Sequence, residues 1–292
     1  METRISSSQK EVVISDELPV VLIGERINPA GRKRFQEALK ANNFEIVREE
    51  ALAQAQAGAD ILDVCVATFG GDEESLLPQA VQLIMATTDL PLCLDSANPR
   101  ALEAALKVYK GKALVNSVTG EKQSLESVLP LIKEYNAAVI ALVQDDEGIP
   151  KNSERRIAIA HNIVEMAESF GIPREDIIID CLISSVGADS NSAIEVLKAI
   201  QKIKSDLGVN ITLGASNVSF GLPNRTLLNN AFIVMAMAAG ATSFITDAEK
   251  TRLHVLAADL LLGKDKYARR YIEAYHQAQG RLPVEKGSRP SS

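Results

Sequence analysis

Eight short apolar runs alternate with longer amphipathic segments between residues 19 and 262, and this alternation restricts the possible folds more than any other feature of the sequence. Apolar strands separated by segments of helical periodicity are typical of a parallel sheet joined by crossover helices. The runs are continuously apolar rather than alternating, so both faces of each strand are expected to be covered by protein. The runs begin at Pro19, Ile61, Pro91, Ala113, Ala137, Ile177, Ile211 and Ser243.

Eight helices are expected between and after these strands. Eight strands and eight helices together predict an α/β fold, a (β/α)₈ TIM barrel. The rival is an open, doubly wound sheet, which usually carries a GxGxxG turn after its first strand. Here that turn reads GERINPAGRKRF, which favours the closed barrel. The predicted helices span residues 34–57, 73–87, 99–107, 124–135, 154–170, 192–206, 227–239 and 251–262.

Two terminal segments lie outside these repeats and define the expected domain limits. Residues 1–18 form a polar N-terminal extension, which is expected either to cover the bottom of the barrel or to stay loose. The barrel domain is assigned to residues 19–280 and includes an extra helix over residues 265–279. Residues 281–292 are expected to be a flexible tail because they lack apolar periodicity.

Charge and composition exclude several functional classes. A net charge of −7 without a basic run argues against nucleic-acid binding. No apolar stretch reaches the roughly 18 residues that a membrane helix needs, and the N-terminus lacks an apolar signal segment, so we expect a cytoplasmic protein. Cys65, Cys93 and Cys181 are far apart and form no CxxC spacing. They predict neither a disulfide framework nor a metal site.

Polar residues stand at or near the ends of most predicted strands. Active sites of such barrels lie at the carboxyl ends of the strands, so these side chains are expected to converge. His161, His254 and His276 all fall in predicted helices, and no Ser or Cys nucleophile is paired with a His base. Acyl transfer is therefore disfavoured. The converging residues are Glu25, Asn28, Asp63, Asp95, Asn116, Asp180, Ser216, Asn217 and Asp247.

Carboxylates and carboxamides in this arrangement suit a flat heterocycle with an amino-pyrimidinone edge. Such an edge alternates hydrogen-bond donors and acceptors, which Asp and Asn side chains match in the ring plane. Any single Asp or Asn here is also explained as a cap or turn residue at a strand-to-helix junction. Because polar side chains stand at seven strand ends, binding of such a heterocycle is favoured over seven separate caps or turns. A pterin is a heterocycle with an amino-pyrimidinone edge.

The order of several motifs resembles the pterin-binding methyltransferase family. This family includes methyltetrahydrofolate:corrinoid methyltransferases and the folate module of cobalamin-dependent methionine synthase, and shares its barrel with dihydropteroate synthase. The resemblance covers about residues 20–262. It rests on GERIN (24–28), GADILDV (58–64), LCLDS (92–96), VNS (115–117), GIPK (148–151), IIIDCLI (177–183) and GASNVSFGLPNR (214–225).

The resemblance implies a role for each site residue. Asp95, Asn116 and Asp180 would hydrogen-bond the pterin ring, and Asn217 would lie beside its N5 atom. Asn217 and Asp180 would then serve the chemical step. The folate would also be contacted by Arg225, and Glu25 would lie at the pocket floor.

The sequence departs from some relatives after SNVS. They carry a glutamine that reaches the folate, where this chain has Phe220. Contact at that point is therefore expected to be apolar or absent.

The implied reaction moves a methyl group between N5 of tetrahydrofolate and the cobalt of a cobamide. The chain lacks the DxHxxG motif that binds cobalamin, so the cobamide is expected on a corrinoid partner protein. The direction stays open between one-carbon metabolism that starts from methyltetrahydrofolate and methylation of tetrahydrofolate in an O-demethylase system. Relatives also imply a homodimer.

Two other functions remain open. Dihydropteroate synthases usually carry NxTPDSF-like and SRK-like motifs, whereas this chain has GERINPAG and FITDAEKTRLH. A non-catalytic folate-binding barrel would keep the ring-binding residues but tolerate loss of Asn217.

Overall fold

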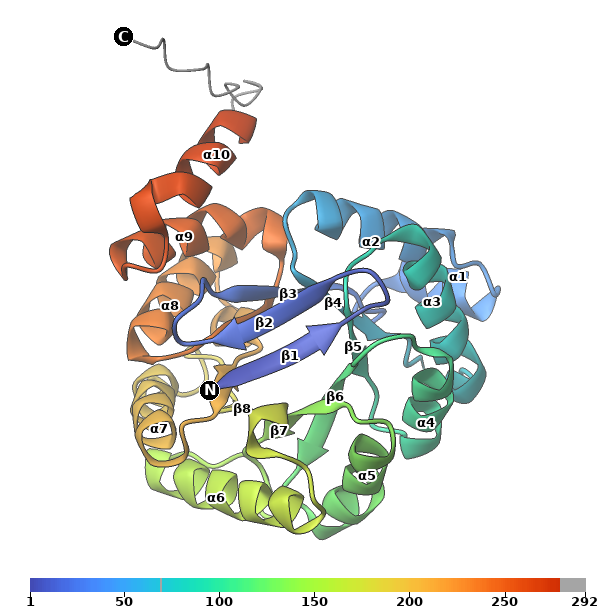
Figure 1. The fold of residues 1–292 in the computed structure, drawn as a ribbon, viewed down its shortest axis with the longest axis horizontal. Helices are drawn as coiled ribbons and strands as arrows, with labels where there is room; N and C mark the ends of the chain where they lie inside the picture. Colours follow the sequence, from blue (N-terminus) through green and yellow to red (C-terminus); the bar gives the residue numbers. More distant parts are fainter. Residues whose placement is uncertain (69, 279–292) are drawn as a thin grey trace, which may run out of the picture.

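The computed structural model describes residues 1–68 and 70–278, and its centre is an eight-stranded parallel sheet closed into a barrel (Figure 1). Neighbouring strands follow the order β10-β3-β4-β5-β6-β7-β8-β9. Between the last strand and the first, the N–H groups of Thr242 and Ile245 donate to the carbonyls of Ile211 and Leu213 at 3.0 and 2.9 Å. The predicted barrel is confirmed. Its strands are β3 (Val21–Ile27), β4 (Ile61–Cys65), β5 (Leu92–Asp95), β6 (Leu114–Thr119), β7 (Ala138–Leu142), β8 (Ile177–Asp180), β9 (Asn210–Thr212) and β10 (Ser243–Thr246).

Helices surround the barrel in the predicted order, so that each strand is covered on its outer face. Their apolar stripes pack on the strands in one continuous core. None of the helices in the described part of the chain combines the length and apolar character that a bilayer crossing needs. The helices after the first crossover are α3 (Glu73–Thr87), α4 (Pro99–Val108), α5 (Lys122–Glu134), α6 (Ser153–Ser169), α7 (Ser192–Leu207), α8 (Arg225–Ala239) and α9 (Ala248–Leu261).

The prediction of one helix over residues 34–57 is wrong. The structure has two helices there, α1 (Lys33–Lys40) and α2 (Glu45–Gln56). Asn42 takes a left-handed conformation with φ of 55° and ends the first helix. The side-chain oxygen of Asn43 then accepts a hydrogen bond from the N–H of Glu45 at 3.0 Å. Asparagine tolerates the left-handed region and favours helix starts, so two adjacent asparagines divide the segment.

The last helix also begins later than predicted. Tyr267 and Ala268 have φ of 62° and 54°, which interrupts the segment after α9. The carboxylate of Asp265 accepts the N–H groups of Arg270 and Tyr271 at 3.1 and 3.0 Å. This cap starts α10 (Arg269–Ala278). The tail predicted at 281–292 lies outside the described residues.

Residues 1–18 form an antiparallel hairpin of β1 (Glu2–Ser6) and β2 (Glu11–Ser15). The hairpin crosses the end of the barrel where the strands begin (Figure 1). Ile5 and Ile14 are fully buried there among side chains from the first halves of the barrel strands. The buried amide of Asn210, the first residue of β9, donates to Thr3 Oγ1 and the Ile14 carbonyl at 2.9 Å each. This end of the barrel is therefore filled by protein.

Replacing Ile5 by alanine is expected to lower the free energy of unfolding by about 2–5 kcal/mol, the usual cost of truncating a fully buried isoleucine. Urea denaturation of both proteins measures the difference. Glu2→Ala on the exposed side of the same strand is the matched control. A loss below about 1 kcal/mol would contradict the packing of the hairpin into the barrel.

Candidate functional site

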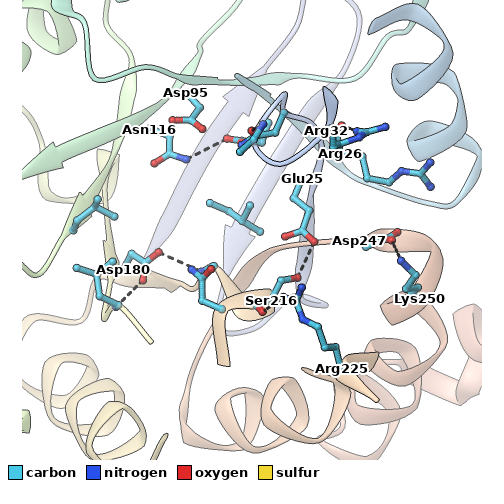
Figure 2. A pocket seen from close by; sticks show the side chains of 18 residues that line it. Glu25, Arg26, Arg32, Asp95, Asn116, Asp180, Ser216, Arg225, Asp247 and Lys250 are labelled. Atoms are coloured by element: carbon cyan, nitrogen blue, oxygen red, sulfur yellow. Dashed lines mark hydrogen bonds and ion pairs between the residues drawn. The ribbon is translucent and has the colours of Figure 1, made fainter. Parts of the chain in front are cut away.

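A cavity of about 760 Å³ opens at the carboxyl ends of the barrel strands. The size falls within the range of about 300–1,000 Å³ that small-molecule sites occupy. The structure brings all six predicted site residues to this cavity, together with four further polar residues that were predicted to converge there (Figure 2). The first group is Glu25, Asp95, Asn116, Asp180, Asn217 and Arg225, and the second is Asn28, Asp63, Ser216 and Asp247.

Parallel register explains why residues far apart in sequence meet. Asp95 and Asp180 are the last residues of β5 and β8. Asp95 is paired with Asn116 of the neighbouring strand. Asn116 and Glu25 lie near the ends of their strands and not at them, because β6 continues to Thr119 after a register shift that follows Asn116, and β3 continues to Ile27. Both side chains nevertheless line the cavity.

Asp63, Asp95 and Asn116 form one polar group, in which Asp63 is buried and the other two side chains are half-buried. Asn116 Nδ2 donates to Asp63 Oδ1 at 3.2 Å. Burial raises the pKa of both carboxyls, and the charge of Asp63 raises that of Asp95 further. Two neighbouring carboxyls resist full ionisation, and a ligand that donates hydrogen bonds to them would stabilise their ionised forms.

Asp180 is held by backbone groups rather than by a cation. Its two carboxylate oxygens accept the N–H groups of Leu182 at 2.8 Å and Gly214 at 3.3 Å. Burial raises the pKa of Asp180 from an ordinary 3.8 to about 6, and the two N–H donors oppose this shift. The carboxylate keeps lone pairs free for a ligand in the cavity.

The raised pKa of Asp180 predicts a pH-dependent stability. The pKa of the Asp180 carboxyl is near 3.8 in an unfolded chain and about 6 in the folded protein. Its contribution to the free energy of unfolding is therefore fully present at low pH and is lost as the pH rises through 6. The stability advantage of wild type over Asp180→Ala should fall by about 2 kcal/mol between pH 4.5 and 7.5. Urea denaturation at both pH values measures it, with the exposed Glu134→Ala as control. An advantage independent of pH would contradict this account.

Asn217 lies on the short 3₁₀ segment Ala215–Ser219 that follows β9. Its side chain is exposed to the cavity. A Cβ at position 214 would lie 3.1 Å from Asn217 Nδ2, so the glycine gives the amide its space. Asn217 therefore presents its amide to the cavity from a backbone turn of fixed shape.

Glu25, Ser216 and Arg225 form a second polar group. The Ser216 hydroxyl donates to Glu25 Oε1 at 2.7 Å, and Arg225 Nη2 donates to the Ser216 carbonyl at 2.7 Å. Burial raises the pKa of Glu25, and the charge of Asp247 adds to this effect. Phe220 is 70% exposed and lies under the Arg225 guanidinium, 5.8 Å from ring centre to Cζ, but does not line the cavity.

Three cations at the cavity were not among the predicted site residues. Arg26 and Arg32 both pair with the carboxylate of Glu50, and Lys250 Nζ lies 2.6 Å from Asp247. Figure 2 shows these cations and Arg225 on the side opposite Asp95, Asn116 and Asp180. The cations of the cavity thus lie together on one side, which we call the cationic side although the carboxylates of Glu25 and Asp247 lie there as well, and Asp95, Asn116 and Asp180 form the opposite, carboxyl and amide side. In the described residues, no group of three or more His, Cys, Asp or Glu side chains is arranged to hold a metal ion.

Sequence comparison links this cavity to known enzymes. The sequence model of the family described as "Pterin binding enzyme" matches residues 24–247. A methylcorrinoid:tetrahydrofolate methyltransferase of Eubacterium limosum is 32% identical over 270 residues, which are 89% of this chain and 97% of the relative. The methionine synthase of Mycobacterium tuberculosis is 30% identical over 262 residues. That match covers 85% of this chain but only 22% of the synthase.

Structural comparison finds the same fold in dihydropteroate synthases. The enzyme of Xanthomonas albilineans with 4-aminobenzoic acid has a TM-score of 0.70 and 18% identity, covering 89% of this chain and 98% of its own. The enzyme of Clostridium difficile with pteroic acid has a TM-score of 0.70 and 22% identity, covering 85% and 98%. At these identities the likeness establishes the barrel alone. With the family match over most of the chain, this protein belongs to the pterin-binding enzyme family.

Proposed function

We propose that this protein transfers a methyl group between N5 of tetrahydrofolate and the cobalt of a corrinoid carried by a partner protein. The observation that carries the proposal is that Asn217 shares one cavity with Asp95, Asn116 and Asp180. The relative from Eubacterium limosum, matched over almost its whole length, is named for this reaction.

The carboxyl and amide side of the cavity would hold the pterin ring. The amino-pyrimidinone edge presents N–H donors to Asp95 and Asp180, while the Asn116 amide can both donate and accept. The opposite, cationic side would face the benzoyl and glutamate end of the folate, whose carboxylates are negative. Arg225 supplies charge there in a chain that is acidic as a whole.

The chemical step is a heterolytic methyl transfer. When tetrahydrofolate is methylated, the N5 lone pair bonds to the methyl carbon and the cobalt–carbon bond breaks with both electrons on cobalt. Cobalt passes from Co(III) to Co(I), and N5 releases its proton. In the reverse direction Co(I) attacks the methyl carbon, and protonated N5 leaves as a neutral amine.

The protein must therefore favour a proton on N5 in the transition state. The Asn217 carbonyl oxygen would accept a hydrogen bond from N5–H⁺ that strengthens as charge develops, with Asp180 or a water molecule completing the network. An amide cannot act as an ordinary acid, so its contribution is electrostatic. The same group serves both directions because a catalyst lowers one shared barrier.

The corrinoid would arrive on a separate protein. This part of the proposal is supported by the relative from Eubacterium limosum, which is named for a methylcorrinoid substrate and is matched over 97% of its length. We place the reaction in methyltetrahydrofolate-dependent one-carbon metabolism or in an O-demethylase system that methylates tetrahydrofolate. Free thiols at all three cysteines support a reducing, cytoplasmic compartment.

Product analysis separates this function from its rivals. The protein is incubated with tetrahydrofolate and a methyl-Co(III) corrinoid, both free and bound to a corrinoid protein, and separately with p-aminobenzoate and a dihydropterin pyrophosphate. We expect 5-methyltetrahydrofolate in the first reaction and no dihydropteroate in the second. Dihydropteroate would assign a synthase instead, and folate binding without product would leave a non-catalytic barrel.

The outer face of α8 supports the expected homodimer. From Thr226 to Ala239 this helix contains no charged residue. Its exposed positions lie at helical spacing on one face, and the exposed fractions of Leu227, Val234 and Met235 are 63%, 38% and 50%. An uncharged apolar face is compatible with a second copy of itself, and two-fold homodimers are the commonest closed assemblies. We propose that two copies pair through this face.

Sedimentation tests the dimer. Wild type should sediment as a dimer and Val234→Glu as a monomer, since the substitution buries a charge on each side of the interface. Ile194→Glu, a 49% exposed apolar residue of the neighbouring α7, is the matched control and should stay dimeric. A monomeric wild type would contradict the proposal.

A further inference from the structure

Arg156, in the first turns of α6, is a buried cation without a carboxylate partner. Its exposed fraction is 1%, and among the described residues the charges of Glu195 and Asp189 act on it without forming an ion pair. Its guanidinium instead donates to three backbone carbonyls, those of Cys181 at 2.9 Å, Asn152 at 3.2 Å and Leu182 at 3.2 Å. Burying an unpaired charge is costly, so these three contacts require an explanation beyond packing.

Two of the three carbonyls flank a strained residue. Leu182 has φ of 50°, in the left-handed region that a leucine rarely adopts. The carbonyl of Cys181 belongs to the peptide plane before Leu182. The carbonyl of Leu182 belongs to the peptide plane after Leu182. The relative orientation of these planes defines φ and ψ of Leu182. A single guanidinium that holds both planes therefore holds the strained conformation.

The conformation of Leu182 reaches the cavity through Asp180. The N–H of Leu182 lies in the plane fixed by Arg156 Nε and donates to Asp180 Oδ1 at 2.8 Å. The Leu182 side chain itself lines the cavity beside Asp180. Rotation of the Cys181–Leu182 peptide plane would move this donor away from Asp180, and the change in φ would also reorient the Leu182 side chain in the cavity.

We infer that Arg156 is a positioning residue that sets the Asp180 carboxylate and the Leu182 side chain in the orientation that receives the pterin ring. The planar fork of arginine can reach several carbonyls at fixed angles, whereas a lysine ammonium cannot hold both planes in the same way. The inference rests on the proposed function for the identity of the ligand, but the orientation of Asp180 can be measured without any ligand.

The ligand-free test is a ¹³C NMR titration of the Asp180 carboxyl in wild type, Arg156→Met and Arg156→Lys. A displaced Leu182 N–H no longer stabilises the ionised carboxylate, so the titration midpoint should move to higher pH in both variants. Arg156→Lys keeps the positive charge and separates positioning from simple Coulombic attraction. An unchanged midpoint in Arg156→Lys would overturn the inference.

The second readout is the dissociation constant for tetrahydrofolate. We expect both variants to bind about tenfold more weakly than wild type. Because Asp180 also completes the network around N5, the turnover number at saturating folate should fall as well, but by less than in Asn217→Ala. In Arg156→Lys, adding Leu182→Asn should recover part of the affinity because asparagine tolerates the left-handed region. The control is Lys112→Met, which breaks the buried ion pair with Asp176 at the closed end of the barrel.

The outcomes distinguish the two proposals. If Arg156→Met, Arg156→Lys and the control Lys112→Met all bound tetrahydrofolate within twofold of wild type, the role of Arg156 would be overturned. A wild-type protein that does not bind tetrahydrofolate would refute the proposed function, while the carboxyl titration would still decide whether Arg156 positions Asp180.

Discussion

Replacing Asn217 by alanine is expected to lower the turnover number for methyl transfer by about 100- to 1,000-fold, the usual cost of removing one group that stabilises transition-state charge. The dissociation constant for tetrahydrofolate should change far less, because the hydrogen bond to N5–H⁺ strengthens only as the transition state forms. Single-turnover kinetics at saturating folate measures the chemical step, and titration calorimetry measures binding.

The neighbouring Ser216 provides a comparison for this result. Its hydroxyl bonds to Glu25 rather than facing the open cavity alone, so Ser216→Ala tests a general disturbance of the same 3₁₀ segment. We expect it to reduce turnover much less than Asn217→Ala. Equal losses in the two variants would mean that the shape of the loop, and not the amide, limits the reaction.

Replacing Asp95 by alanine is expected to act mainly on affinity. A hydrogen bond to a charged partner contributes about 1.5–3 kcal/mol, so the dissociation constant for tetrahydrofolate should rise by about 10- to 150-fold. The turnover number of the saturated enzyme should fall much less, because the ring edge is bound similarly before and during the reaction.

Asp146→Ala is the matched control for Asp95→Ala. This exposed carboxyl follows β7 at the same end of the barrel but does not line the cavity. It should leave folate affinity unchanged. If Asp95→Ala and Asn217→Ala both reduced turnover and affinity in the same proportion, the division between ring binding and chemistry would be wrong.

Most of the barrel could be predicted because buried parallel strands leave a strong signal. Each predicted apolar run overlaps one observed strand, since a strand covered on both faces is mostly apolar. The division of residues 34–57 into two helices was not predicted, because asparagine also occurs inside helices and its presence at positions 42 and 43 does not by itself indicate a helix end. The N-terminal hairpin was not predicted as strands, because its pairing depends on contacts with Asn210 far along the chain.

The site was predictable where a side chain ends a strand and not where its position depends on a distant partner. Asp95 and Asp180 follow from strand ends alone. Arg26 and Arg32 reach the cavity edge only because Glu50 on α2 pairs with both. The sequence does not indicate that Arg156 is buried or that it contacts the residues after β8, since a charged residue near the start of a helix is usually exposed to solvent.

The position of Asp63 shows an intermediate case. An aspartate inside an apolar strand was visible in the sequence, but its contact with Asn116 two strands away was not. Parallel pairing places Asp63 beside Cys93 and Cys65 beside Asp95, and thereby brings two carboxyls to adjacent strands. Such a pair is recognised only when the register is known.

The corrin spectrum during a single turnover tests the central proposal most directly. The protein is mixed without oxygen with tetrahydrofolate and an equal amount of methyl-Co(III) corrinoid, either free or bound to a corrinoid protein. We predict that the methyl-Co(III) spectrum converts to that of Co(I) as 5-methyltetrahydrofolate forms in equal amount. Omission of folate should prevent this conversion, and the substitution Asn217→Ala should slow it about 100- to 1,000-fold. An unchanged corrin spectrum with both forms of the corrinoid, in the presence of bound folate, would contradict methyl transfer at this site.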